Sequence, residues 1–194
     1  MMPRKRPLWA FTLLSLLGIF LLAIAGLWLM TRAETKGTLE IRLKDHREAI
    51  GDFATLEVSV RVVRLSPKTA RTAAQADWQD LSPSVKQVDL TRYTGKNSAV
   101  IFHGKLARGH VEAIHLKLDP VKGILKKNQQ EVLIENLITP IKLPFSIHPR
   151  TETGIVLDLV VLDKRDHPPQ GYELHIKGYE LYTGGRLVDK IPPG

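Results

Sequence analysis

The segment GTLEIRL, residues 37–43, alternates apolar and polar side chains without a break. Leu39, Ile41 and Leu43 take every second position, with polar or charged residues between them. Because successive side chains of a strand point to opposite faces, this pattern predicts a strand with one buried and one solvent-facing side. The segment LEVSVRV, residues 56–62, repeats the same alternation.

Further strands are predicted from similar patterns, and short clusters of glycine, proline and polar residues lie between them. These segments are residues 85–90, 99–103, 111–118, 131–138, 155–163 and 172–182. Only residues 67–76, rich in alanine and threonine, suggest a helical turn. Many short strands with turn signals between them, and no long amphipathic helix, predict a mainly β domain. We expect an antiparallel β-sandwich over residues 37–190.

A long apolar stretch precedes this domain. Residues 8–30, LWAFTLLSLLGIFLLAIAGLWLM, contain no charged side chain over 23 positions. At about 1.5 Å per residue, a helix of this length exceeds the hydrocarbon core of a bilayer. Leu8 and Met30 bound the run, and Trp9 and Trp28 stand near its ends, where indole rings favour the headgroup region. We expect one transmembrane helix that anchors the domain to membrane lipid.

A cleaved signal peptide is the alternative, because Ala23-Ile24-Ala25 provides a cleavage motif of small residues. The apolar run continues to Met30, however, and is longer than the roughly 7 to 15 residues of a signal-peptide core. The basic residues at positions 4–6 are typical of an uncleaved signal anchor whose N-terminus stays in the cytoplasm. The predicted order is a cytoplasmic tail 1–7, the helix 8–30, a linker 31–36, a periplasmic or extracellular domain 37–190 and a tail 191–194.

Several motifs in the domain resemble a known family. They are GTLEIRLKD (37–45), FATLEVSVRVVRL (53–65), DWQDL (77–81), VDLTRY (88–93), GHVEAIHLKL (109–118), IKLPFSI (141–147) and IVLDLVVLD (155–163). Together they resemble an uncharacterised family of domains of unknown function, found in exported or membrane-anchored bacterial and archaeal proteins. The resemblance spans about residues 37–181. It implies a transthyretin-like or carboxypeptidase-regulatory-like β-sandwich, and it implies no activity.

Two departures from the pattern of that family concern histidines. His110 stands where such domains often have a tyrosine after glycine, and His46-Arg47 replace the usual small residues after the aspartate of the first strand. For this reason we transfer no ligand site from the resemblance.

Motifs of catalysis are missing from the domain. Gly95-Lys96-Asn97-Ser98 has the form of the end of a phosphate-binding loop, but Leu90 stands where that loop requires glycine. The sequence contains no G-x-S-x-G motif, no Ser-x-x-Lys pair and no cysteine, so acyl transfer has no visible nucleophile. We expect a protein that is not an enzyme.

The seven histidines are the best remaining candidates for metal ligands. No H-E-x-x-H or H-x-H pair exists among them, and we interpret them as surface and turn residues. The most carboxylate-rich stretch combines Asp158, Asp163 and Asp166 with His167, but it lacks the spacing of a calcium-binding loop. We therefore expect neither a metal nor another cofactor.

The chain carries 28 Lys and Arg against 20 Asp and Glu. Lys122, Lys126 and Lys127 cluster in one predicted loop, which could contact anionic headgroups or an acidic partner. An ordinary solvated loop is the alternative. Nucleic acid is not an expected partner, because aromatic residues are not interleaved with the basic ones and the domain is expected outside the cytoplasm.

The linker of residues 31–36 reaches about 20 Å at most, so it holds the domain against the membrane surface. On the helix, Ser15, Gly18, Ala25 and Gly26 fall near one face and could admit a neighbouring helix, although G-x-x-x-G is absent.

These features favour a non-catalytic accessory subunit that braces a larger respiratory or photosynthetic membrane complex on its periplasmic face. Other subunits of that complex would be its partners, and nothing indicates a homo-oligomer. The candidate contact residues are Leu39, Ile41, Lys122, Lys126, Lys127, Ile141 and Phe145. For the apolar ones, burial in the domain's own core is the alternative. A free-standing envelope binding module for a carbohydrate, peptide or cation is the alternative function.

Overall fold

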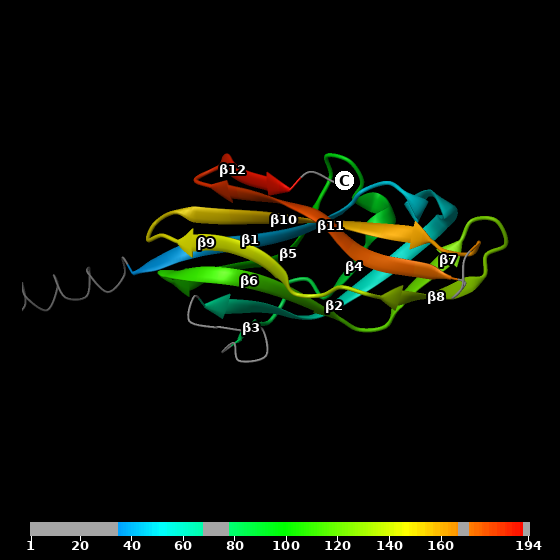
Figure 1. The fold of residues 1–194 in the computed structure, drawn as a ribbon, viewed down its shortest axis with the longest axis horizontal. Coiled ribbons are helices and arrows are strands. Elements are labelled where there is room, and N and C mark those ends of the chain that lie inside the picture. Colours follow the sequence, from blue (N-terminus) through cyan, green and yellow to red (C-terminus); the bar gives the residue numbers. More distant parts are fainter. Residues whose placement is uncertain (1–34, 68–77, 167–170, 192–194) are drawn as a thin grey trace, which may run out of the picture. The chain divides into compact units, whose positions relative to one another are not determined.

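The structure is a computed structural model that describes residues 35–67, 78–166 and 171–191 (Figure 1). The chain divides into two compact units, Met1–Thr35 and Lys36–Gly194. The predicted anchor, its small-residue face and nearly all of the predicted helical turn lie outside the described residues. Within the described ranges, no helix has the length and apolar character needed to cross a membrane.

The second unit is built from strands joined by short connections, so the prediction of a mainly β domain is confirmed. Its strands are β1 Lys36–Asp45, β2 Phe53–Pro67, β3 Gln79–Leu81, β4 Gln87–Asp89, β5 Ala99–Ala107, β6 Gly109–Leu118, β7 Val121–Leu125, β8 Glu131–Asn136, β9 Ile141–Ile147, β10 Glu152–Asp163, β11 Tyr172–Thr183 and β12 Arg186–Ile191. Two short 3₁₀ helices, η1 Ala49–Asp52 and η3 Leu90–Arg92, connect strands.

The strands form one sheet in the order β5-β1-β10-β11-β8-β7-β2-β6-β9, with β12 beside β11 and with β3 and β4 beside β2. The sheet is mixed, because β1 runs parallel to β10 and β8 runs parallel to β11. The expectation of a purely antiparallel arrangement is therefore wrong at these two pairs. Alternation along a strand reports that one face is buried, but it carries no information on the direction of the neighbouring strand.

Strand β2 links the two halves of the sheet. Its first part pairs with β7 and β4, and its second part pairs with β6 and β3, with a register shift between Val60 and Val62. Side chains from both halves enter one hydrophobic core, which contains Leu39 of β1, Leu65 of β2 and Leu157 of β10. The long alternating pattern of β2 thus keeps one side buried while its pairing partners change.

Several apolar residues predicted as partner contacts lie inside this core. Leu39 and Ile41 are 0% exposed and Phe145 is 5% exposed, so the alternative of core burial holds for them. Residues 37–43 form an inner strand between β5 and β10, which makes the expectation of an exposed contact element wrong there. Strand β9 ends the sheet, where Pro144 is exposed and costs no ladder hydrogen bond on the outer side.

Three strands had no clear signal in the sequence. Strand β3 has only three residues, and β12 is exposed along its whole length, so burial leaves no alternation there. Strand β7 contains Gly123, which weakens a strand pattern but has a packing reason here. A Cβ atom at Gly123 would lie 2.4 Å from Cδ1 of Phe53, so the ring occupies the space that a side chain would need.

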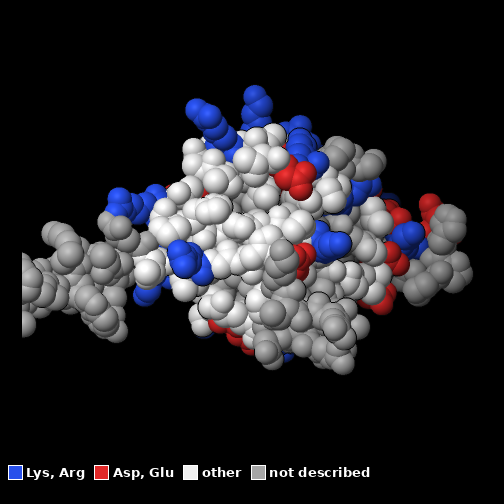
Figure 2. Space-filling view, turned by 60° about the vertical axis from the view of Figure 1, so that its left-hand side comes forward, with Lys and Arg blue, Asp and Glu red and all other residues white. Residues whose placement is uncertain are grey.

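Charged side chains are distributed over the surface. Figure 2 shows Lys and Arg spread over one face, with Asp and Glu among them. Several ion pairs join neighbouring segments: Arg61 of β2 pairs with Asp119 after β6, and Lys122 of β7 pairs with Glu131 of β8. The described part of this face therefore carries both signs of charge.

Candidate functional site

A pocket of about 970 Å³ lies where η1, the β7–β8 hairpin and the start of β11 meet. In Figure 1 the β7–β8 hairpin is at the opposite end of the domain from the start of β1. The pocket is lined by Gly51, Asp52, Leu125, Lys126, Lys127, Asn128, Gln130, Val132, Leu133, Arg165, Gly171 and Tyr172. Its volume is within the range typical of small-ligand sites in proteins.

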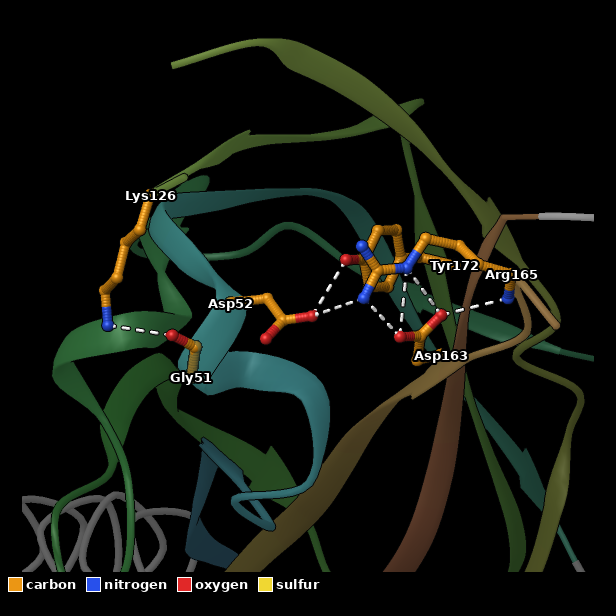
Figure 3. A network of polar contacts seen from close by, with 6 residues as sticks. All are labelled: Gly51, Asp52, Lys126, Asp163, Arg165 and Tyr172. Carbon is orange, nitrogen blue, oxygen red and sulfur yellow. Dashed lines mark hydrogen bonds and ion pairs between the residues drawn. The ribbon is translucent and has the colours of Figure 1, made fainter. Parts of the chain in front are cut away.

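One wall of the pocket is a network centred on Arg165, which lies between two carboxylates (Figure 3). The Nε atom of Arg165 donates to Oδ1 of Asp163 at 2.9 Å, and its Nη2 atom donates to Oδ2 of Asp52 at 3.1 Å. The hydroxyl of Tyr172 donates to the same oxygen of Asp52 at 2.9 Å. These contacts fix the guanidinium group and both carboxylates in one orientation.

The contacts of this wall shift the pKa values of Asp163, Arg165 and Tyr172. Hydrogen bonds from Arg165 hold the pKa of Asp163 below its usual value, and the carboxylate in turn raises the pKa of Arg165. Burial, followed by the hydrogen bond to Asp52, raises the pKa of Tyr172 to about 12. Arg165 therefore stays a cation and Tyr172 a neutral donor near neutral pH, so neither acts as an acid or a base there.

Tyr172 is held from behind by the core. Its ring packs edge-on against Phe53 with the ring centroids 4.8 Å apart, and the guanidinium of Arg165 lies 5.0 Å from the centre of the Tyr172 ring. Tyr172 is 4% exposed and Phe53 is fully buried. The absence of a side chain at Gly123 provides the space for Phe53. The wall is thus set by core packing and not by loop residues alone.

The rim is formed by the turn between β7 and β8. The Nζ atom of Lys126 donates to the carbonyl oxygen of Gly51 at 2.9 Å, and its backbone N–H donates to the carbonyl of Asp52 at 2.8 Å. Gln129 adopts a positive φ of 56°, and its side-chain amide donates to the carbonyl of Lys126. Lys127 is exposed and makes no ion pair with the described residues.

The predicted basic cluster is divided by the fold. Lys126 and Lys127 line the pocket, whereas Lys122 pairs with Glu131 across the hairpin at 2.8 Å. Ile141, another predicted contact, is half-buried on β9.

Three apolar residues, Leu125, Val132 and Leu133, also line the pocket. Leu125 and Val132 are half-buried, and Leu133 is 69% exposed. The described lining contains no serine, cysteine or histidine.

A second polar cluster lies at the end of β1. Asp45 and Asp158 are buried, and one carboxylate oxygen of each has no hydrogen-bond partner among the described residues. Lys44 Nζ and His46 Nδ1 approach Oδ2 of Asp158 at 3.6 and 3.5 Å. Burial is the main cause that raises the pKa of Asp45 to about 6. Within the described ranges, no three His, Cys, Asp or Glu side chains are grouped so that they could hold a metal ion.

The histidines occupy separate strands and loops. His110 lies in β6 and not in a turn, with its ring nitrogens 3.0 Å from Ser146 Oγ and Glu112 Oε1. His115 is half-buried with its ring centroid 6.0 Å from that of Trp78, and burial lowers the pKa of its imidazole. His167, from the predicted carboxylate-rich stretch, lies outside the described residues.

Arg165, Asp52 and Tyr172 were not singled out by the sequence pattern. Asp52 is 113 residues from Arg165 and 120 residues from Tyr172 along the chain, so only folding brings the three together. The single local signal is Arg165 two residues after Asp163, a spacing that is common in solvated turns.

Comparison with known proteins identifies one matching family. The model of a family described as a domain of unknown function, DUF4382, matches residues 36–174. Neither the curated proteins nor the solved structures contain a match to the chain. The matched region runs from β1 into β11, and it includes Asp52, Lys126, Arg165 and Tyr172 of the pocket. The chain therefore belongs to the DUF4382 family of domains of unknown function.

Proposed function

We propose that this protein is a non-catalytic binding module of the cell envelope and that the pocket beside the β7–β8 hairpin is its ligand site. The observation that carries the proposal is a pocket of about 970 Å³ with a wall fixed by Asp52, Arg165 and Tyr172. Ligand sites commonly combine apolar lining residues with a few polar groups that are already held in place. The described lining holds no serine, cysteine or histidine, and its carboxylate and tyrosine hydroxyl are hydrogen-bonded to each other, so we favour binding over catalysis.

The proposal includes the topology expected from the sequence: a membrane helix at residues 8–30, a domain outside the cytoplasm and a two-layer sandwich form of the sheet. A linker of six residues keeps the start of β1 within about 20 Å of the membrane. The pocket lies at the other end of the domain.

An accessory subunit of a membrane complex is the second candidate, and strand β12 favours it. Among the described strands it pairs with β11 alone, and it exposes Leu187, Val188 and Ile191 at 51%, 56% and 48%. An exposed strand edge can pair with the backbone of a partner protein. Lys190 and the register shift beside β12 are features that also protect an edge from pairing, so the pocket remains the stronger observation.

Site-specific photocrosslinking separates the two candidates. A photoreactive amino acid replaces Leu133 in the pocket, Leu187 on β12 or the exposed Val85 as the matched control, and cells are irradiated before the protein is purified. The proposal expects an adduct of defined mass at position 133 that is missing at position 85. A stoichiometric membrane-protein adduct at position 187, with nothing at position 133, would replace the binding module by the accessory subunit.

A further inference from the structure

The charge of the pocket is not balanced by its own residues. Its lining contains three cations, Lys126, Lys127 and Arg165, and one carboxylate, Asp52, and Asp163 outside the lining also pairs with Arg165. The network thus has two carboxylates for one arginine, and with the two lysines a surplus of one positive charge remains. Oδ2 of Asp52 already accepts hydrogen bonds from Arg165 and from the hydroxyl of Tyr172. The carboxylate of Asp52 is thus hydrogen-bonded to Tyr172 and paired with Arg165 inside the wall.

The two lysines of the rim supply the unbalanced positive charge. Lys126 uses one Nζ hydrogen on the carbonyl of Gly51, a neutral acceptor, so its charge stays uncompensated among the described residues. Lys127 forms no ion pair with the described residues. Lys122, on the same hairpin but outside the pocket, is paired with Glu131. The lysine beside the pocket therefore has a carboxylate partner, whereas the two lysines of the rim have none among the described residues.

The lining of the pocket also contains an exposed apolar side chain that an apolar group of a ligand could cover. Leu133, which lines the pocket, is 69% exposed. Covering such surface is favourable by about 25 cal/mol per Å². The aromatic ring of the wall, Tyr172, is 4% exposed and is already covered by Phe53 and Arg165. A neutral sugar ring would therefore find no open aromatic face for stacking in the described lining.

From these contacts we infer that the ligand carries an anionic group, a carboxylate or a phosphate, attached to an apolar moiety. The anion lies against Lys126 and Lys127 at the rim, and the apolar moiety covers Leu133. This inference rests on the proposed function, because it names the ligand class of the same pocket. Charge-assisted hydrogen bonds from lysine to such an anion are stronger than those between neutral groups.

The test uses the full chain in detergent micelles, with ¹³C-labelled methyl groups of leucine and valine observed by NMR. Benzoate, phenyl phosphate and the neutral benzamide are titrated separately, since all three are water-soluble and share one apolar ring. The methyl signals of Leu133, Val132 and Leu125 report on the pocket, and those of Leu157, buried in the core, serve as the internal control.

We expect benzoate and phenyl phosphate to shift the pocket signals to saturation and benzamide to bind at least about tenfold more weakly. Tighter binding of benzoate identifies a carboxylate ligand, and tighter binding of phenyl phosphate identifies a phosphate ligand. Lys127→Glu should weaken both anions about fivefold or more, whereas Lys142→Glu, the same change at an exposed position on β9, should leave them unaltered.

Two other results would overturn the inference in distinguishable ways. Equal binding of benzamide and benzoate, or binding of benzoate that is insensitive to Lys127→Glu, would leave a ligand pocket without a preference for anions. If none of the three probes shifted the pocket signals while the Leu157 signals showed an intact core, the proposed function would fail together with the inference.

Discussion

Replacement of Asp45 by asparagine should remove a pH-dependent part of the stability of the domain. Asp45 is 1% exposed, and its Oδ1 atom accepts a hydrogen bond from the backbone N–H of Arg47 at 2.7 Å. Its Oδ2 atom is buried without a partner among the described residues. Burial first, and then the negative charge of Asp158, raise the pKa of Asp45 from 3.8 to about 6. Asparagine is uncharged at every pH, so it lacks this titration.

The sign follows from proton binding. The folded domain binds the proton of Asp45 more tightly than the unfolded chain does, so the stabilisation is complete below the unfolded pKa. It is lost as the pH rises through the folded pKa of about 6. A shift from 3.8 to about 6 corresponds to about 3 kcal/mol, at roughly 1.4 kcal/mol per pKa unit.

The assay is urea unfolding of the full chain in detergent at several values between about pH 4 and pH 7. The free energy of unfolding of the wild type should fall by about 2.5 kcal/mol across this window relative to that of Asp45→Asn, slightly less than the full value because pH 4 lies just above the unfolded pKa. Asp80→Asn makes the same chemical change at an exposed partner of Arg64 and should keep the slope of the wild type. Parallel curves for the wild type and Asp45→Asn would refute the reasoning.

Two further changes have expected outcomes. Gly123→Ala places a Cβ atom 2.4 Å from Phe53 and should lower the free energy of unfolding by about 1 to 3 kcal/mol, whereas Gly51→Ala, which meets nothing within 4 Å, should have little effect in the same thermal melts. Glu180→Gln should destabilise the domain at neutral pH and lose this effect as the pH falls toward about 2, because a hydrogen bond from Tyr182 and then the neighbouring lysines lower the pKa of Glu180 to about 2. Acid unfolding curves that coincide for the wild type and Glu180→Gln would contradict the second expectation.

The alternating segments of the sequence predicted their strands well, since burial of one face leaves a direct trace in the residue order. Residues 37–43 and 56–62 both lie in strands whose apolar side chains are largely buried. The parallel pairing of β1 with β10 left no such trace, because the partner of a strand does not change its own alternation. Strand β12 was missed for the opposite reason, since all of its residues are exposed.

The pocket was predictable only in part. Lys126 and Lys127 stand together in the sequence and were recognised as a basic group. Asp52, Arg165 and Tyr172 come from three separate segments, and their hydrogen bonds depend on the register of strands that are distant along the chain. No short motif in the sequence contains these three residues together. The strands that bring them together, in contrast, are visible in the alternation of apolar and polar residues within each segment.

The inner position of β1 determines when the chain can fold. This strand is the first of the described strands to be made during synthesis, yet its parallel neighbour is β10, Glu152–Asp163, and its other neighbour is β5, Ala99–Ala107. Contacts between segments so far apart along the chain form slowly, because loop closure costs entropy before the contacts form. β1 therefore remains without a hydrogen-bonded neighbour on one side until most of the polypeptide has been completed. The edge of β1 that β10 later covers therefore needs protection against pairing with other chains until that point.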